Sequence, residues 1–170
     1  MNQMLFWIAQ GFGAGRVPKA PGTFGSLIGL GWFALLLWPG SVWLFIIGLL
    51  GMLALAVVAS GVAEKILGQK DPSIVVLDEI AAMPACFIVP LFFETVALGH
   101  LPSPDWFFIS QAGWLLVPGF LAFRLFDIWK PWPVRMSQNL AGGWGVVVDD
   151  LLAAAYTNAV LFVLMVIQAQ

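Results

Sequence analysis

The residues best suited to chemistry in this 170-residue sequence are two acidic pairs, Asp78-Glu79 and Asp149-Asp150, and a further acid, Asp127. Carboxylate oxygens are the protein ligands that Mg²⁺ prefers, and the ion usually keeps several waters beside them. A metal held in this way polarises a phosphoryl group and activates or orients water for attack on it. We therefore predict that these five acids supply the ligands of a Mg²⁺ ion and the catalytic base.

The acidic pairs have a simpler explanation as well. Acidic residues are favoured in the first turn of a helix because the macrodipole attracts negative charge there. Neighbouring side chains on a helix point about 100° apart, so we expect one acid of each pair to face a metal while the other supports it. The sequence has two such pairs and a further acid, Asp127. This number of acids favours a metal site over the simpler explanation that each pair stabilises the start of a helix.

Basic side chains accompany the acids and suit a phosphate group, whose charge they neutralise. Arg124, Asp127 and Lys130 are spaced three residues apart, so a helix would place them on one face. A simple ion pair is the alternative interpretation of that spacing. Pro131 follows directly, and a residue before proline leaves the helical region. Lys130 is therefore a predicted catalytic residue at the mouth of the site, with Arg135 nearby.

The segment 11–26, GFGAGRVPKAPGTFGS, is rich in glycine and proline and is predicted to be a loop. Thr23 or Ser26 can cap a helix that begins near Leu27, and a helix N-terminus is a ready anion site. An ordinary capped turn explains the segment equally well, since it matches neither the P-loop nor the dinucleotide pattern. The predicted phosphate-binding residues are Arg16, Gly22, Thr23, Ser26, Arg124 and Arg135.

The composition indicates where such a site lies. Hydrophobic residues make up 61% of the chain and charged residues 9%, against roughly 25% charged residues in an ordinary soluble domain. The mean hydropathy is +0.97. These values are typical of a membrane protein, and the length predicts a single domain, 1–170. A large basic face for nucleic acid is absent, and the single cysteine, Cys86, provides no disulfide framework.

The apolar stretches predict an all-α, multihelical integral membrane bundle. A span needs roughly 20 apolar residues, so the segment 27–38 is expected to be a short or re-entrant first span. About four further apolar helices are predicted, at 42–63, 80–93, 106–123 and 146–167, with Pro84 and Pro90 kinking the second of them. The polar stretches between these helices carry the candidate site residues.

The basic residues predict the orientation of the bundle. Every Lys and Arg lies before the short first span, after 42–63, or between the last two helices. The positive-inside rule places such loops in the cytoplasm. These loops also hold nearly all the acids, whereas His100 falls on the opposite side and is not expected to take part. The charged loops are therefore expected to form one site on the cytoplasmic face.

Four segments together resemble the phosphatidylglycerophosphatase A family: residues 11–26, SIVVLDE at 73–79, FRLFDIWKPWPVR at 123–135 and GGWGVVVDD at 142–150. Their order and spacing match over nearly the whole chain, with Ala81-Ala82 as a departure where the family often has a glycine. The resemblance implies an all-helical, Mg²⁺-dependent lipid phosphatase of the bacterial inner membrane. It also implies a reaction in phospholipid biosynthesis, in which phosphatidylglycerophosphate loses its terminal phosphate to give phosphatidylglycerol.

Two other classes of protein remain open on the sequence. In an ion- or proton-coupled transporter the carboxylates would line a cation path, with acids deep within the spans; here they cluster at span ends. A membrane scaffold held by ion pairs explains less easily why carboxylates outnumber nearby basic residues. The number of metal ions, the choice between direct attack by water and an aspartyl phosphate, and the oligomeric state are also left open.

Overall fold

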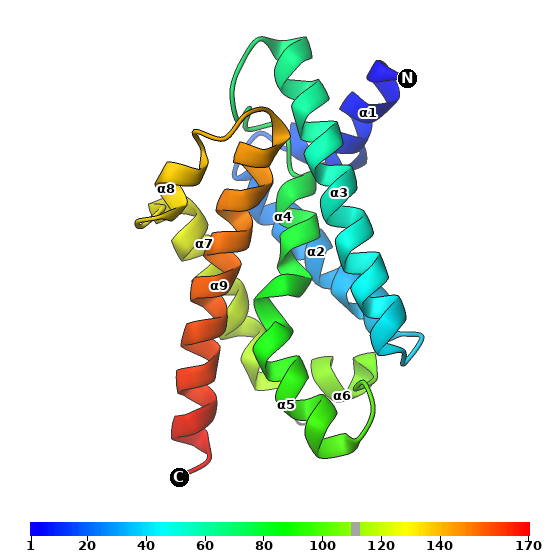
Figure 1. Ribbon diagram of the computed structural model, residues 1–170, viewed down its shortest axis with the longest axis vertical. Helices are drawn as coiled ribbons and strands as arrows, with labels where there is room; N and C mark the ends of the chain where they lie inside the picture. The colour runs from blue at the N-terminus through cyan, green and yellow to red at the C-terminus, as the bar shows by residue number, and fades with distance from the viewer. Residues whose placement is uncertain (110–112) are drawn as a thin grey trace.

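The computed structural model describes residues 1–109 and 113–170, and within them every regular element is a helix (Figure 1). The all-α prediction is confirmed for this part of the chain. In chain order the elements are α1 (Asn2–Ala9), η1 (Gly11–Arg16), α2 (Pro21–Leu37), α3 (Val42–Leu67), α4 (Leu77–Ala82), η2 (Met83–Phe87), α5 (Ile88–Leu98), α6 (Pro104–Phe108), η3 (Gly113–Leu115), α7 (Leu116–Trp129), α8 (Val134–Ser137) and α9 (Gly143–Gln168).

The two longest helices, α3 and α9, run in opposite directions and pack against each other (Figure 1). Gly143, the first residue of α9, permits the close approach, because a Cβ at this position would overlap the carbonyl oxygen of Val57 in α3. Helix α7 also packs against α9. The beginning of α9, which carries one of the acidic pairs, is therefore held by two neighbouring helices.

Helix α2 begins at Pro21, six residues before the start predicted near Leu27. The prediction of a loop over 11–26 holds only for residues 17–20. Residues 11–16 form the 3₁₀ segment η1, which is kinked at Phe12 and Gly13, and the chain is helical from Pro21. The physical reason is that proline at the first helical position has a fixed φ that suits a helix and lacks only an N–H that would be unpaired there. Thr23 and Ser26 consequently lie inside α2 and do not cap it.

The segment Leu77–Leu98 is a long apolar helix interrupted by the 3₁₀ turn η2, as Pro84 led us to expect. Asn158 of α9 spans the interruption. Its Oδ1 accepts a hydrogen bond from the N–H of Val89 at 2.8 Å, and its Nδ2 donates to the carbonyl of Ala85 at 2.7 Å. These are the two groups that an unbroken helix would join, so a side chain from α9 satisfies the backbone at the break and ties α5 to α9.

Buried aromatic side chains form the core where α2, η2 and α6 meet. The ring of Phe33 is stacked on that of Phe87, with 5.1 Å between centroids, and meets the edge of Phe107 at 4.9 Å. All three rings are fully buried. Such stacked and edge-to-face pairs add to the stabilisation from burial alone, so this core fixes α2 against the interrupted span.

In the part of the chain that the structure describes, three helical segments are long and apolar enough to cross a membrane: Val42–Leu67, Leu77–Leu98 and Gly143–Gln168. They contain the predicted helices 42–63, 80–93 and 146–167, while α2 is a shorter apolar helix. The predicted helix 106–123 is wrong as a single span. Its residues 110–112 lie outside the described residues, and the others divide between α6, η3 and α7. Pro118 falls in the first turn of α7, where its missing N–H costs no hydrogen bond, so it marks a helix start.

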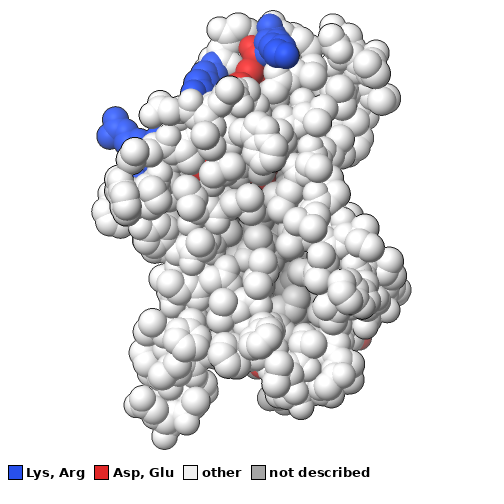
Figure 2. All heavy atoms as spheres, viewed as in Figure 1, with Lys and Arg blue, Asp and Glu red and all other residues white. Residues whose placement is uncertain are grey.

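Lys and Arg side chains on the face shown in Figure 2 gather at one end of the molecule, over the end of α3 and around α8. The acidic pairs lie at the same end, because Asp78 and Glu79 begin Leu77–Leu98 and Asp149 and Asp150 lie in the second turn of α9. Charged residues that are far apart in sequence therefore meet at one end of three apolar helices.

Candidate functional site

A cavity of about 260 Å³ lies at this charged end of the bundle. Its walls come from the start of α2, the first turn of α4, the end of α7, the start of α9 and the loop between α3 and α4. Six carboxylates and two basic side chains line it, with a few neutral residues: Ala20, Pro21, Gly22, Asp71, Ser73, Val75, Asp78, Glu79, Arg124, Asp127, Lys130, Asp149 and Asp150. All five predicted metal ligands thus share one cavity.

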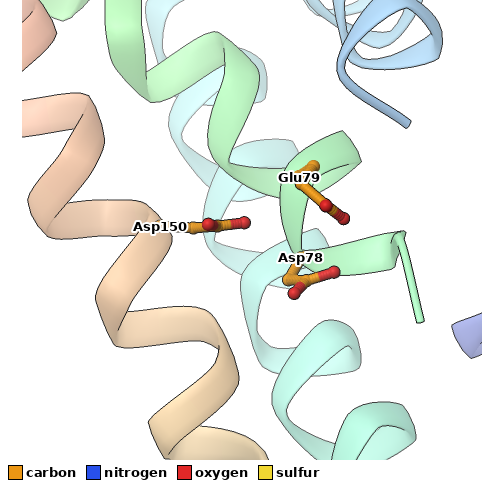
Figure 3. A group of neighbouring side chains, drawn as sticks. All are labelled: Asp78, Glu79 and Asp150. Carbon is orange, nitrogen blue, oxygen red and sulfur yellow. The ribbon is translucent and has the colours of Figure 1, made fainter. Parts of the chain in front are cut away.

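Three of these acids form a tight group, which we call the acidic trio: Asp78, Glu79 and Asp150 (Figure 3). Each offers a carboxylate oxygen, and these oxygens lie within 4.8 Å of one another. Asp150 projects from α9 toward the first turn of α4, which carries the other two (Figure 3). We expected only one acid of the Asp78-Glu79 pair to face a metal, but both belong to the trio. The longer side chain of Glu79 lets its carboxylate reach the same point as that of Asp78.

Burial of the acidic trio makes its charge expensive. Asp78 is 6% exposed and Asp150 is 2% exposed. Each member of the trio also has one buried carboxylate oxygen without a hydrogen-bond partner among the described residues: Asp78 Oδ1, Glu79 Oε2 and Asp150 Oδ2. Buried polar atoms are normally hydrogen-bonded, and like charges at this separation repel. A bound cation relieves both costs, so the donor set fits a metal ion with oxygen ligands.

Arg124 connects α7 to the acidic trio and to α2. Its Nη1 lies 2.7 Å from Asp127 Oδ2 on the same helix and 3.7 Å from Glu79 Oε1 on α4. The same nitrogen donates a hydrogen bond to Ser26 Oγ at 3.4 Å. The predicted ion pair between Arg124 and Asp127 is therefore present, and it lies in the wall of the cavity.

Gly22 leaves room for this arrangement. A Cβ at Gly22 would overlap Glu79 Oε1 and would lie 3.0 Å from Arg124 Nη2. Two further glycines of α2 allow close packing on the interrupted span, since a Cβ at Gly29 would lie 2.5 Å from that of Met83 and one at Gly25 would lie 3.0 Å from that of Val76. These three glycines therefore bring α2 against α4 and its acids.

Lys130 belongs to a second charged group in the lining of the cavity. Its ammonium contacts Asp149, and it lies 3.3 Å from Asp71 Oδ2. Burial lowers the pKa of Lys130, but the hydrogen bond and charge of Asp149 and the charge of Asp71 outweigh burial, so the pKa lies above its usual value. Lys130 is therefore cationic at neutral pH. The two acids of the Asp149-Asp150 pair therefore have different partners: Asp150 belongs to the acidic trio, and Asp149 forms an ion pair with Lys130.

Four of the six predicted phosphate-binding residues lie outside the lining of the cavity. Arg16 is exposed, and its Nε donates to Gln10 Oε1 at 2.7 Å. Arg135 is exposed on α8, and Thr23 is half-buried in α2. Ser26 is buried and donates to the carbonyl of Gly22, besides accepting from Arg124. The structure thus brings Gly22 and Arg124 into the cavity and Ser26 next to it.

Asp71, Ser73 and Gln138 belong to the site, although the sequence analysis assigned none of them a catalytic, phosphate-binding or metal-binding role. Asp71 and Ser73 line the cavity, and Gln138 Nε2 donates to Asp71 Oδ2 at 2.8 Å. The sequence signal at Asp71 is an Asp-Pro dipeptide, which indicates a turn and no chemistry. The folded loop between α3 and α4 brings Asp71 to Lys130, and Gln138, which follows α8, reaches Asp71.

The fold and the site together define a class: an apolar helical protein with one cavity that holds both an acidic trio suited to a cation and Arg and Lys side chains suited to phosphate. Known sequences agree with this class. The chain matches the profile of the family described as Phosphatidylglycerophosphatase A over residues 7–165. This chain therefore belongs to the phosphatidylglycerophosphatase A family, as its four sequence segments predicted, and it is a phosphatase.

Individual relatives extend the match over most of the chain. A phosphatidylglycerophosphatase A of Escherichia coli (strain K12) is 30% identical over 164 residues, which cover 95% of this chain and 84% of that protein. The phosphatidylglycerophosphatase A of Haemophilus influenzae is 35% identical over 158 residues, with 91% and 85% covered. A Bacteroides thetaiotaomicron protein with the provisional name phosphatidylinositol-3-phosphatase is 34% identical over 160 residues, with 88% and 86% covered. No solved structure matches the chain. These relatives do not favour the transporter alternative.

Proposed function

We propose that this protein hydrolyses phosphatidylglycerophosphate to phosphatidylglycerol and inorganic phosphate in a Mg²⁺-dependent reaction. The observation that carries the proposal is the acidic trio, which shares one cavity with Arg124 and Lys130. The names of the relatives from E. coli and H. influenzae support the substrate. The relative from B. thetaiotaomicron is named for another phosphorylated phospholipid, which supports the broader class of lipid phosphomonoesters.

The acidic trio would hold the Mg²⁺ ion. Its three unpartnered oxygens supply hard ligands, and the cavity of about 260 Å³ leaves room for the waters that Mg²⁺ retains. When bound, the ion supplies neutralisation of the phosphate charge and activation of water. Asp127 and Asp149 lie outside the trio, each paired with a basic residue, so we assign them to supporting roles and not to the first ligand set.

The residues of the chain then divide the work of hydrolysis. Lys130 and Arg124 bind the terminal phosphate and stabilise the charge that develops on its oxygens. The oxygen of a water molecule bonds to phosphorus, and the bond from phosphorus to the glycerol oxygen breaks. The glycerol oxygen takes up a proton from solvent water. The proton that the water loses passes to a carboxylate outside the acidic trio, Asp127 or Asp149.

We place this reaction at the cytoplasmic surface of the bacterial inner membrane. Support comes from the Lys and Arg residues gathered at the same end of the molecule as the cavity (Figure 2), because basic loops favour the cytoplasmic side. The acidic pairs lie at the ends of apolar helices, the depth at which a lipid headgroup meets water. A cavity at that depth can receive a lipid phosphate while its acyl chains stay in the bilayer.

Phosphate release from defined lipids in mixed micelles tests the substrate. Purified protein should release phosphate from phosphatidylglycerophosphate in Mg²⁺ and produce phosphatidylglycerol, and Asp127→Asn should lower the rate. Asp105→Asn is a matched control because Asp105 is an exposed acid in the first turn of α6, and it should keep the wild-type rate. No release from this lipid, or an equal kcat/KM for phosphatidic acid, would overturn the proposed substrate.

A further inference from the structure

Strained backbone conformations are concentrated at the cavity. Among the described residues, four that are not glycine have a positive φ: Phe12, Ala20, Asp71 and Lys130. Three of these four line the cavity. Asp71 has φ 48° and Lys130 has φ 49°, and their side chains meet. Non-glycine residues hold such conformations only where their surroundings compel it, and they cluster at functional sites. The contact between Asp71 and Lys130 therefore calls for a functional explanation.

Asp71 is held by one residue of the preceding helix and by two residues distant in sequence. Its backbone N–H donates to Glu64 Oε1 of α3 at 3.0 Å. Its Oδ2 accepts from Gln138 Nε2 at 2.8 Å and from Lys130 Nζ at 3.3 Å. Asp71 is not a member of the acidic trio. Because one of its oxygens accepts hydrogen bonds from two donors, it is suited to fix the position of the Lys130 ammonium in the cavity wall.

The lysine that Asp71 contacts has three N–H donors in tetrahedral directions. Asp149 accepts one hydrogen bond from the ammonium and Asp71 accepts another. Two fixed acceptors on different elements determine the direction of the third N–H. The Lys130 side chain is 22% exposed and lines the cavity, so a donor remains available to a group bound there.

We propose that Asp71 is a positioning residue, which with Asp149 directs the remaining N–H of Lys130 at the phosphate of the substrate. This inference rests on the proposed function and adds to it a residue that never touches the substrate. A partly exposed ion pair contributes little to stability, and the Asp71 side chain is 37% exposed. Its loss should therefore impair catalysis far more than folding.

A double-mutant cycle tests whether Asp71 acts through Lys130. Asp71→Ala should lower kcat for phosphate release about 10²-fold, the order expected when a catalytic group is misplaced by about 1 Å, with KM changed much less. Asp71→Asn should fall in between, because its amide oxygen still accepts from the lysine. In a Lys130→Met background Asp71→Ala should cause no further loss, since coupled residues are not additive. Asp105→Ala serves as the exposed-acid control.

Two results would overturn the positioning role: an unchanged kcat in Asp71→Ala, or an equal loss in the presence and absence of Lys130. Thermal unfolding of each variant identifies a loss due to misfolding, and Asp71→Asn keeps the test available if the alanine variant does not fold. If the wild-type protein releases no phosphate from phosphatidylglycerophosphate, the proposed function fails. The affinity of the same four proteins for inorganic phosphate then tests the role of Asp71. The positioning role is supported if Asp71→Ala weakens phosphate binding only when Lys130 is present, and any other result overturns it.

Discussion

Replacing Gly22 with alanine should separate activity from stability. The added methyl group would overlap Glu79 Oε1 and lie 3.0 Å from Arg124 Nη2. Gly22 is in the first turn of α2 and is buried against this pair. The Glu79 carboxylate is the end of a flexible side chain, so it can move away and the helices need not part. The substitution therefore changes the position of one member of the acidic trio.

The size of the effect follows from the required movement. The added Cβ would lie 2.2 Å from Glu79 Oε1. This distance is about 1 Å shorter than an ordinary contact between a methyl carbon and an oxygen. A displacement of about 1 Å at a catalytic group lowers the rate on the order of 10²-fold. Alanine is a better helix former than glycine by about 0.5–1 kcal/mol, which offsets the cost of moving Glu79. We expect kcat/KM to fall about 10²-fold with an unchanged or slightly raised Tm.

Gly31→Ala provides the matched control for this prediction. Gly31 lies in the same helix, and a Cβ there meets no atom within 4 Å. Its alanine variant should show the wild-type kcat/KM and a small rise in Tm. Phosphate release and thermal unfolding, both measured in the same detergent, compare the two variants. Wild-type activity in Gly22→Ala, or a loss of activity matched by a loss of folded protein, would refute the reasoning.

Three further substitutions test other parts of the structure. Asp150→Asn should raise the Tm measured in a metal chelator, by about 2–4 °C for each kcal/mol of repulsion removed, because it takes one like charge from the acidic trio; a lower Tm would contradict that repulsion. Asn158→Leu leaves the N–H of Val89 and the carbonyl of Ala85 unpaired, at about 1–3 kcal/mol each, so its Tm should fall by several degrees; an unchanged Tm would show that the interrupted span needs no partner. Gly143→Ala should force α9 away from α3 and destabilise the protein by about 1–3 kcal/mol, whereas Gly51→Ala, which has open space, should not.

The sequence predicted the convergence of the acids because charge is costly beside apolar helices. Asp78 and Asp150 lie at the ends of two long apolar segments, and a chain that folds into a membrane bundle brings such ends to a common surface. The length of the apolar stretches also identified the helices around Val42–Leu67 and Gly143–Gln168. These features are local in the sequence, so they can be recognised before the fold is known.

The start of α2 and the partners of Lys130 were harder to predict, for different reasons. Pro21 at the first helical position is a recognised start signal, but the surrounding glycines of residues 11–26 favoured a loop. Asp71 contacts Lys130 where both residues have a left-handed backbone, and Gln138 contacts Asp71. These residues are far apart in the sequence, and no spacing rule connects them. Arg135 was grouped with the site because it follows Lys130 closely, yet α8 leaves it exposed and outside the cavity lining.

The Mg²⁺ dependence of phosphate release from phosphatidylglycerophosphate tests the central claim most directly. The account predicts that a chelator abolishes release by the wild-type protein and that Mg²⁺ restores it. It also predicts that Asp78→Asn and Asp150→Asn need at least about ten times more Mg²⁺ for half of their maximal rate, as expected when a ligand of the ion is lost. Full activity in the chelator, or an unchanged Mg²⁺ requirement in both variants, would contradict the assignment of the acidic trio as the metal site.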